Sequence, residues 1–213
     1  MADLDFFFDP VCPWAWITSR WVTEVKQLRD YDVQWKFISL KFINEEKMDY
    51  SKMPDGYKEI HAAGTQGLRM AAKARAEIGN DAVAQVYTLL GTSFHNRNER
   101  ELYVADPIGH VEKLLAEASL PVEWAQAQFD ESFDGLIREE TELALERAGK
   151  DVGTPILTFR PGASNEGSFF GPVISSIPRG DEAKKLWDAV ETLATTSGMA
   201  ELKRSLRAHP KFD

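Results

Sequence analysis

The order of the elements that the sequence predicts indicates an α/β protein, and three observations support this. A dense apolar run at Leu4–Phe8 is followed by a helical pattern and then by an alternating strand. A long stretch at about 54–150 contains no convincing strand. Strand residues return at 155–159 and 167–170, before a last helical pattern. A strand–helix–strand half is therefore separated by helices from a strand–strand–helix half.

The first half begins with a strand over Leu4–Phe8 that an Asp-Pro pair closes. A helix is expected over 13–29, since apolar residues recur there at helical spacing: Trp14, Ile17, Trp21, Val25 and Leu28. Apolar and polar residues alternate over 33–40, which predicts the second strand. The two strands are expected to be parallel, joined by a right-handed crossover. The segment 41–51 is expected to be a loop.

The middle of the chain is expected to be entirely helical. Its predicted helices lie at 57–78, 82–94, 107–119, 123–128 and 130–149. Asp81 is expected to cap the second of these helices, and the pair Asp106-Pro107 to start the third. Because strands resume after this stretch, it is interpreted as an insertion and not as an appended domain.

The second half contains two short strands joined by a Gly/Asn-rich loop, which predicts an antiparallel hairpin. A terminal helix follows to about Leu193, and 200–207 is compatible with one more short helix. The complete order, βαβ then ββα, is the plan of the thioredoxin-like fold with an all-helical insertion. The expected domains are a thioredoxin-like domain, 1–53 with 151–213, and a helical insertion domain, 54–150.

Composition and charge narrow the classes of function. The 213 residues suit one large domain with an insertion, and the net charge of −9 makes nucleic acid and anionic membranes poor partners. No run of about 18 apolar residues predicts a membrane span. Asp3 and Asp5 stand where a signal peptide would be basic, so none is expected. With one cysteine, an internal disulfide is excluded and a reducing cytoplasm is the expected location.

The single cysteine lies at a position that favours reactivity. Cys12 stands at the exit of a turn after the first strand, and Pro13 suits a first helical turn because its missing N–H would have no partner there. Helix N-termini stabilise thiolates, so we expect the pKa of Cys12 in the range of about 3.5–7.5. A lone cysteine is more often a small buried residue. The following proline favours a catalytic interpretation.

A second signal is the proline at the start of the third strand. Pro155 cannot donate to the sheet, so its position needs a reason. In a thioredoxin-like sheet a cis-proline faces the active cysteine here, and the residue before it offers its backbone to a bound thiol. About one X–Pro bond in twenty is cis in general, and a plain strand-initial proline is the alternative. With Cys12 in the same chain, Thr154 and Pro155 are predicted to line the site.

The remaining candidates carry weaker signals. Asn44 lies in the expected loop, and His95 and Asn96 end a predicted helix, so they are candidates for a polar wall of a substrate pocket. The alternatives are a turn residue for Asn44 and a favourable helix-end cation for His95. Trp14 is placed to stack on a flat substrate. His61 and His110 are separated from each other and lack a carboxylate at ligand spacing, so no metal site is expected.

The segment from Asp9-Pro10-Val11-Cys12-Pro13-Trp14 to Trp21 resembles DsbA-like thioredoxin-fold oxidoreductases, above all the actinobacterial mycothiol-dependent nitroreductase type. Further stretches in register are 40–45, 95–96, 152–155, 169–173, 177–180, 186–188 and 212–213. The resemblance spans nearly the whole chain. It implies a cytoplasmic enzyme that uses a low-molecular-weight thiol, mycothiol more than glutathione.

One position departs from the family pattern. The family motif is Cys-Pro-Trp-Cys, and this chain has Ala15 at the fourth position. Ala15 cannot resolve a mixed disulfide. A natural monothiol enzyme, a drift to chemistry that needs one thiol, and an engineered trapping substitution remain open explanations.

The sequence therefore predicts an oxidoreductase in which the Cys12 thiolate forms a mixed disulfide with a small thiol. Nitroaromatic or disulfide compounds are the substrates that the resemblance implies. A kappa-type glutathione transferase or hydroxychromene-carboxylate isomerase, and a redox-inactive binding protein, are the alternatives. The sequence leaves the oligomeric state open, and a homodimer is among the options.

Overall fold

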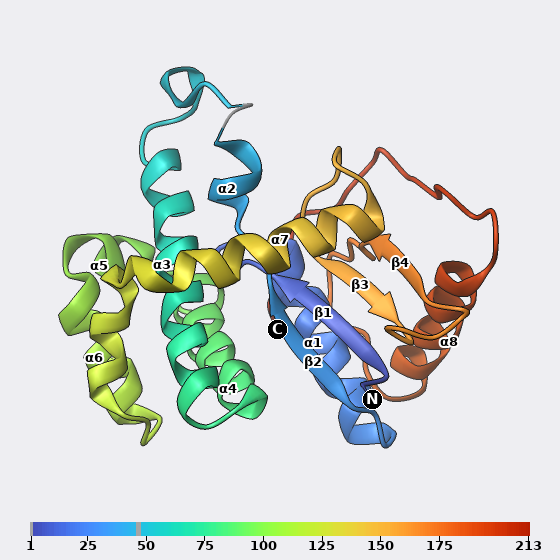
Figure 1. Ribbon diagram of the computed structural model, residues 1–213, viewed down its shortest axis with the longest axis horizontal. Helices are drawn as coiled ribbons and strands as arrows, with labels where there is room; N and C mark the ends of the chain where they lie inside the picture. Colours follow the sequence, from blue (N-terminus) through green and yellow to red (C-terminus); the bar gives the residue numbers. More distant parts are fainter. Residues whose placement is uncertain (1, 46–47) are drawn as a thin grey trace. The chain divides into compact units, whose positions relative to one another are not determined.

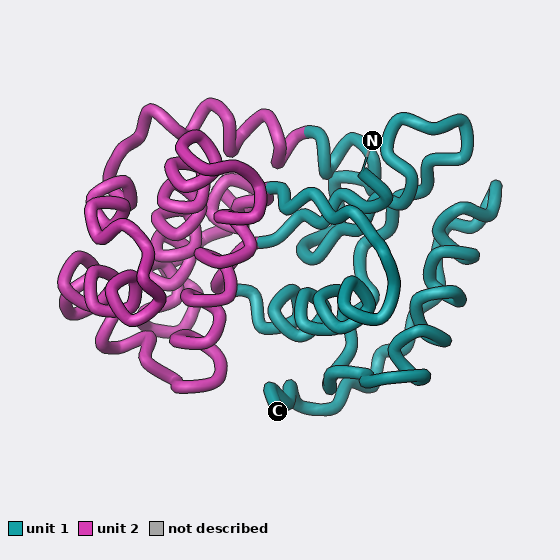
Figure 2. The backbone as a smooth tube through the Cα atoms, turned by 90° about the horizontal axis from the view of Figure 1, so that it is seen from below, with its two compact units in different colours: residues 1–8, 12–36, 143–213 teal, residues 9–11, 37–142 magenta. Residues whose placement is uncertain are grey.

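The structure is a computed structural model that describes residues 2–45 and 48–213. Its chain divides into two compact units, coloured separately in Figure 2. Unit 1 contains the residues up to Phe8 together with Cys12–Lys36 and Leu143–Asp213. Unit 2 contains Asp9–Val11 and Phe37–Glu142. Three residues of the strand-to-helix turn thus belong to the unit that is otherwise formed by the middle of the chain.

Unit 1 is built on a four-stranded sheet with the order β2-β1-β3-β4 (Figure 1). The strands are β1 (Leu4–Phe8), β2 (Val33–Phe37), β3 (Ile156–Phe159) and β4 (Gly167–Phe170). β3 pairs antiparallel with both β1 and β4. Every residue of β1 and β3 is buried, as expected of central strands that are covered on both faces.

Two helices of unit 1, α1 (Pro13–Leu28) and α8 (Gly180–Thr195), pack together beside the sheet (Figure 1). The rings of Trp21 and Trp187 lie 5.2 Å apart, and Trp187 also contacts Phe159 of β3 at 5.4 Å. The indole N–H of Trp21 donates to the backbone oxygen of Ala183 at 3.0 Å. These large aromatic side chains form the core between the helices and the sheet.

Unit 2 is helical over most of its described length. Its α-helices are α2 (Leu40–Asn44), α3 (Tyr57–Glu77), α4 (Asn80–Gly91), α5 (Arg100–Ala105), α6 (Pro107–Glu117) and α7 (Asp134–Ala148), of which α7 continues into unit 1. Shorter turns are η1 (Tyr50–Lys52), the π-helical η2 (Thr92–Asn96), η3 (Val122–Phe129) and η4 (Glu131–Phe133). The long helix α3 contacts α2, α4, α5, η3 and η4. Among the described residues, no helix is both long and apolar enough to cross a membrane.

The predicted α/β class and the order of elements are confirmed. Several boundaries are wrong. The second strand ends at Phe37 instead of Leu40, because Ser39 caps α2 by accepting from the N–H of Phe42 at 3.3 Å. Asn44 therefore lies in a helix, not in a loop. The domain limits expected from the sequence, with an insertion at 54–150, stay a prediction.

Other corrections concern helix ends. Asp81 is not a cap, because α4 begins at Asn80 after Gly79, whose φ is 116°. Asp130 instead caps the 3-10 turn η4, and α7 starts after it. The short helix α5 follows η2 without any periodic signal in the sequence. No helix forms at 200–207, where the side chains are exposed and bury no apolar face.

Candidate active site

Cys12 is the N-cap residue of α1. Its backbone is extended (φ −77°, ψ 115°), and its Sγ accepts from the N–H of Ala15 at 3.4 Å. Pro13 occupies the first helical turn, where its missing N–H costs nothing. The side chain of Cys12 is therefore directed at the free N–H groups of a helix, where the helix dipole stabilises negative charge on sulfur. Only 6% of Cys12 is exposed.

The segment before β3 provides the second contact of this sulfur. The thiol of Cys12 donates to the backbone oxygen of Thr154 at 3.4 Å, across 142 positions of sequence. The Thr154–Pro155 peptide bond is cis. The hydroxyl of Thr154 donates to the oxygen of Phe7 at 3.2 Å, which fixes Thr154 against β1. Cys12, Thr154 and Pro155 thus lie together within unit 1.

The loop after β4 is tied to the same region. The N–H of Gly171 donates to the oxygen of Pro155 at 2.8 Å, and the Gly171–Pro172 bond is also cis. The hydroxyl of Thr18, on α1, donates to the oxygen of Pro172 at 2.8 Å. The helix that carries Cys12 and the segment that carries Thr154 are therefore linked through a third element.

The sulfur can change its charge without losing all its partners. The bond from the Ala15 N–H persists in the thiolate, whereas the bond to the Thr154 oxygen requires the protonated thiol. Ala15 itself is fully buried, while Pro13 and Trp14 are partly exposed. No group of three metal-binding side chains occurs in the described parts of the chain.

The other predicted site residues, Asn44, His95 and Asn96, belong to unit 2. The side chain of Asn44 donates to the oxygen of Leu40 within α2 at 2.8 Å. Asn96 is exposed at the end of η2. Their expected contact with a substrate stays a prediction.

His95 is buried and neutral, so its interpretation as a helix-end cation is wrong. Its Nδ1 is 2.9 Å from a guanidinium nitrogen of Arg100 and must accept, because arginine only donates. Its Nε2 therefore carries the proton and donates to the oxygen of Pro10 at 2.9 Å. Burial, assisted by the charge of Arg100, lowers the pKa of His95 to about 3.

Asp9 is a fully buried carboxylate in the same region of unit 2. One of its oxygens accepts from the N–H of Val11 at 3.1 Å, and the other accepts from the N–H of Leu40 at 2.8 Å. Burial raises the pKa of Asp9 to about 7, although both N–H groups oppose this shift.

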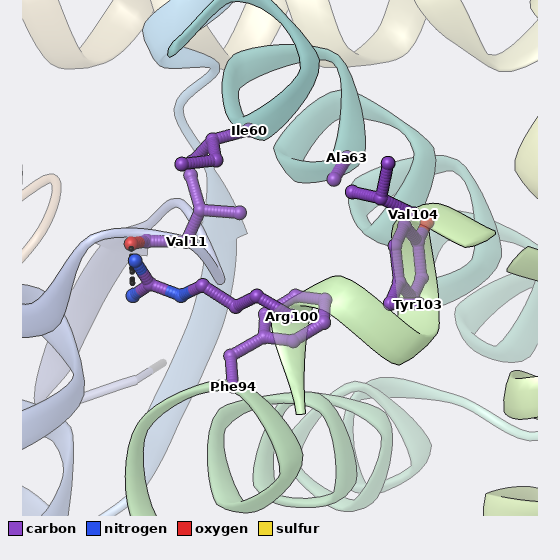
Figure 3. Close-up of a pocket in the computed structure, with 7 residues that line it drawn as sticks. All are labelled: Val11, Ile60, Ala63, Phe94, Arg100, Tyr103 and Val104. Atoms are coloured by element: carbon purple, nitrogen blue, oxygen red, sulfur yellow. Dashed lines mark hydrogen bonds between the residues drawn. The ribbon is translucent and has the colours of Figure 1, made fainter. Parts of the chain in front are cut away.

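A small crevice opens beside Val11 in unit 2 (Figure 3). It is lined by Val11, Ile60, Ala63, Phe94, Arg100, Tyr103 and Val104. Its volume of about 10 Å³ is that of roughly one water molecule. The guanidinium of Arg100 lies at its side and donates to the oxygen of Val11 at 3.4 Å. In this structure the crevice is too small for an aromatic ring.

Asp9, Arg100 and two glycines of α3 are not among the site residues that the sequence predicts. Asp9-Pro10 has the composition of an ordinary turn. A detectable signal was present in Gly64 and Gly67, which stand three residues apart inside an Ala-rich helix where alanine is more favourable.

A family model and a relative each match most of the chain. The sequence model of the Rv2466c-like family, described as "Mycothiol-dependent nitroreductase Rv2466c", matches residues 11–204. A relative from Mycobacterium tuberculosis, the "Uncharacterized protein Rv2286c", is 26% identical over 205 residues, which is 96% of this chain and 82% of the relative.

Solved structures show the same fold. The cytosolic disulfide reductase DsbM from Pseudomonas aeruginosa, determined with GSH, superimposes with a TM-score of 0.58 at 14% identity, covering 88% of this chain and 98% of DsbM. A putative protein disulfide isomerase from Nitrosomonas europaea gives a TM-score of 0.55 at 12% identity, covering 87% and 95%. The thioredoxin-like, DsbA-type fold expected from the sequence is therefore confirmed.

Proposed function

The chain belongs to the Rv2466c-like family of mycothiol-dependent nitroreductases, and on this basis we propose that it is a thiol–disulfide oxidoreductase that acts through Cys12. The observation that carries the proposal is the position of Cys12. Its sulfur caps α1 and contacts the oxygen of Thr154, next to Pro155. A thiol in this environment is stabilised as the attacking thiolate.

The reaction begins with two exchanges at Cys12. The Cys12 thiolate attacks one sulfur of a disulfide substrate, forms a mixed disulfide with it and releases the other sulfur as a thiolate. A low-molecular-weight thiol, in its thiolate form, then attacks the substrate sulfur of this mixed disulfide. Cys12 leaves as a thiolate, and the small thiol ends in a new disulfide with that half of the substrate. These exchanges release one half of the substrate and leave the other half in a disulfide with the small thiol. A second small thiol attacks that disulfide and releases the other half, so two small thiols supply the two electrons and end as one disulfide.

Mycothiol is the small thiol we propose, with glutathione as the second choice. The family description supports mycothiol, and a DsbM structure contains GSH. The backbone of Thr154 and Pro155, directly before β3, is the proposed docking site for this thiol. Asn44, His95 and Asn96 are proposed as further contacts. Such thiols are abundant in a reducing cytoplasm, where we place the protein.

Nitroaromatic compounds are a second proposed substrate class. Each pair of electrons for a nitro group requires two thiols that end as one disulfide. Trp14, partly exposed beside Cys12 in the motif, offers a ring on which a flat compound can stack.

Mass spectrometry of the intact protein tests the role of Cys12. Incubation with oxidised mycothiol should add the mass of one mycothiol to Cys12. The adduct should persist because Ala15 provides no second thiol to displace it, and a reductant should remove it. Cys12→Ser should give no adduct. In Ala15→Cys the adduct should be lost, because the introduced thiolate attacks the sulfur of Cys12, releases the small thiol and forms an internal disulfide.

Two results would contradict the proposal. Binding of reduced mycothiol without any adduct on Cys12 indicates a transferase or isomerase, in which the bound thiol does the chemistry. Unchanged turnover of a disulfide substrate by Cys12→Ser excludes Cys12 as the nucleophile.

A further inference from the structure

We propose that Asp9 and His95 are positioning residues for the Cys12 thiol, because within unit 2 they fix the three residues that immediately precede Cys12. The inference deepens the proposed function, since it concerns the same sulfur. Asp9 is assigned no contact with substrate, and the positioning role of His95 is separate from the contact with the small thiol proposed above. We call residues Asp9–Val11 the entry segment.

The carboxylate of Asp9 holds the entry segment at two points. One oxygen accepts from Val11 within the segment, and the other accepts from Leu40, the first residue of α2. Asp9 is 0% exposed, so water cannot replace either bond. A shift of the segment relative to α2 therefore breaks a buried bond to a carboxylate.

His95 holds the segment from a second side. Its Nε2 proton is donated to the oxygen of Pro10, and Arg100 donates to Nδ1 of His95. Arg100 also donates to the oxygen of Val11 (Figure 3). Because Arg100 fixes which ring nitrogen carries the proton, the donor always faces Pro10. The two backbone oxygens before Cys12 are thus both occupied by donors from unit 2.

The helix α3 is shaped to receive the entry segment. A Cβ on Gly64 would collide with the carboxylate of Asp9, and a Cβ on Gly67 would lie 3.0 Å from the ring of Pro10. Glycine inside a helix is unfavourable relative to alanine. The close approach of the segment accounts for Gly64. At Gly67 a Cβ would also lie 2.8 Å from Leu90 of α4, so Leu90 and Pro10 together leave no room there.

The fixed segment is covalently joined to the residue that does the chemistry. Cys12 holds its sulfur 3.4 Å from the Ala15 N–H only while its own backbone stays extended at the start of α1. A displaced Val11 changes the backbone angles of Cys12 and lengthens this contact. The thiolate then loses part of its stabilisation.

The experiment is a titration of the Cys12 thiolate by its ultraviolet absorbance, with no small thiol or substrate present. Asp9→Asn keeps the shape of the side chain but replaces one carboxylate oxygen by an NH₂ group. This group donates and cannot accept, so one of the two bonds from Val11 and Leu40 is lost. His95→Leu removes the donor to Pro10. Both variants should titrate at a midpoint about one pH unit higher than wild type, a tenfold loss of thiolate.

Two further variants control for loosening of the fold. Asp106→Asn makes the same chemical change at the cap of α6, where the carboxylate accepts from Gly109 at 2.9 Å, and should leave the midpoint unchanged. His95→Gln keeps an N–H donor in the place of Nε2 and should restore the wild-type midpoint. If Asp9→Asn does not fold, the comparison of His95→Leu with His95→Gln decides.

Wild-type midpoints in Asp9→Asn and His95→Leu would overturn the proposal, as would an equal shift in Asp106→Asn. The titration needs no turnover, so its outcome is independent of the proposed reaction. If the midpoints shift but no mixed disulfide forms, the positioning role of Asp9 and His95 stands and the proposed oxidoreductase function is wrong.

Discussion

Two buried titratable side chains of unit 2, Asp9 and His95, have pKa values that are shifted in opposite directions. Asp9 sits among groups that cannot fully solvate its charge, so its pKa rises to about 7. Burial, and then the charge of Arg100, disfavour the protonated form of His95, so its pKa falls to about 3. Each residue therefore leaves a distinct signature in the dependence of stability on pH.

The signature of His95 appears on acidification. Its pKa is depressed in the folded state, so its contribution is complete above the unfolded value of 6.5 and is lost as pH falls toward 3. In His95→Gln this loss is absent. The difference in unfolding free energy between wild type and His95→Gln should shrink by about 2 kcal/mol between about pH 7 and pH 5. Urea denaturation measures it.

Asp9→Asn provides the comparison of opposite sign. The pKa of Asp9 is raised, so its contribution is complete below about 4 and is lost as pH rises through about 7. The advantage of wild type over Asp9→Asn should therefore grow on acidification. Parallel stability curves for wild type and both variants would show that neither group is buried as described.

At the scale of elements, one helix start was predicted correctly from its capping residue and another helix was missed. The pair Asp106-Pro107 starts α6 as predicted, with Asp106 accepting from the N–H of Gly109. The helix α2 has a local cap in Ser39, but its first N–H donates to the carboxylate of Asp9, 31 positions earlier. Local sequence patterns do not contain such a partner.

The glycines of α3 make a quantitative test at this scale. Gly64→Ala gains helix propensity but places its Cβ against the carboxylate of Asp9, so we expect a net destabilisation of about 1–3 kcal/mol. Gly135→Ala, in α7, meets nothing within 4 Å and should be neutral or stabilise by up to about 1 kcal/mol. Thermal unfolding should show a lowered Tm for Gly64→Ala and an unchanged or raised Tm for Gly135→Ala. A stabilised Gly64→Ala would contradict the close packing of Asp9.

At the scale of the whole molecule, unit 1 is assembled from segments that the helical middle of the chain separates. A buried ion pair joins these segments. Arg147, near the end of α7, donates to Asp5 of β1 at 2.8 Å and also contacts Glu166 at 3.3 Å, before β4. The side chain of Asp5 is 6% exposed.

Removal of this arginine should be costly. Arg147→Met leaves Asp5 as a buried charge without its partner, and we expect a loss of about 3–5 kcal/mol. The matched change Arg29→Met breaks an exposed pair with Asp188, and should cost at most about 1 kcal/mol. Chemical denaturation compares the two variants. Equal losses would show that the pair with Asp5 is not a buried tie.

The α/β class, the order of the strands and the cysteine at the start of a helix could be predicted from the sequence alone. These features are encoded locally, in periodicity and in the residues that begin and end helices. Only the tertiary structure showed that the Cys12 thiol meets the oxygen of Thr154 and that unit 2 holds the entry segment through Asp9 and His95. Hydrogen bonds across many positions of sequence leave no periodic signal, because each depends on where the fold brings two distant backbones.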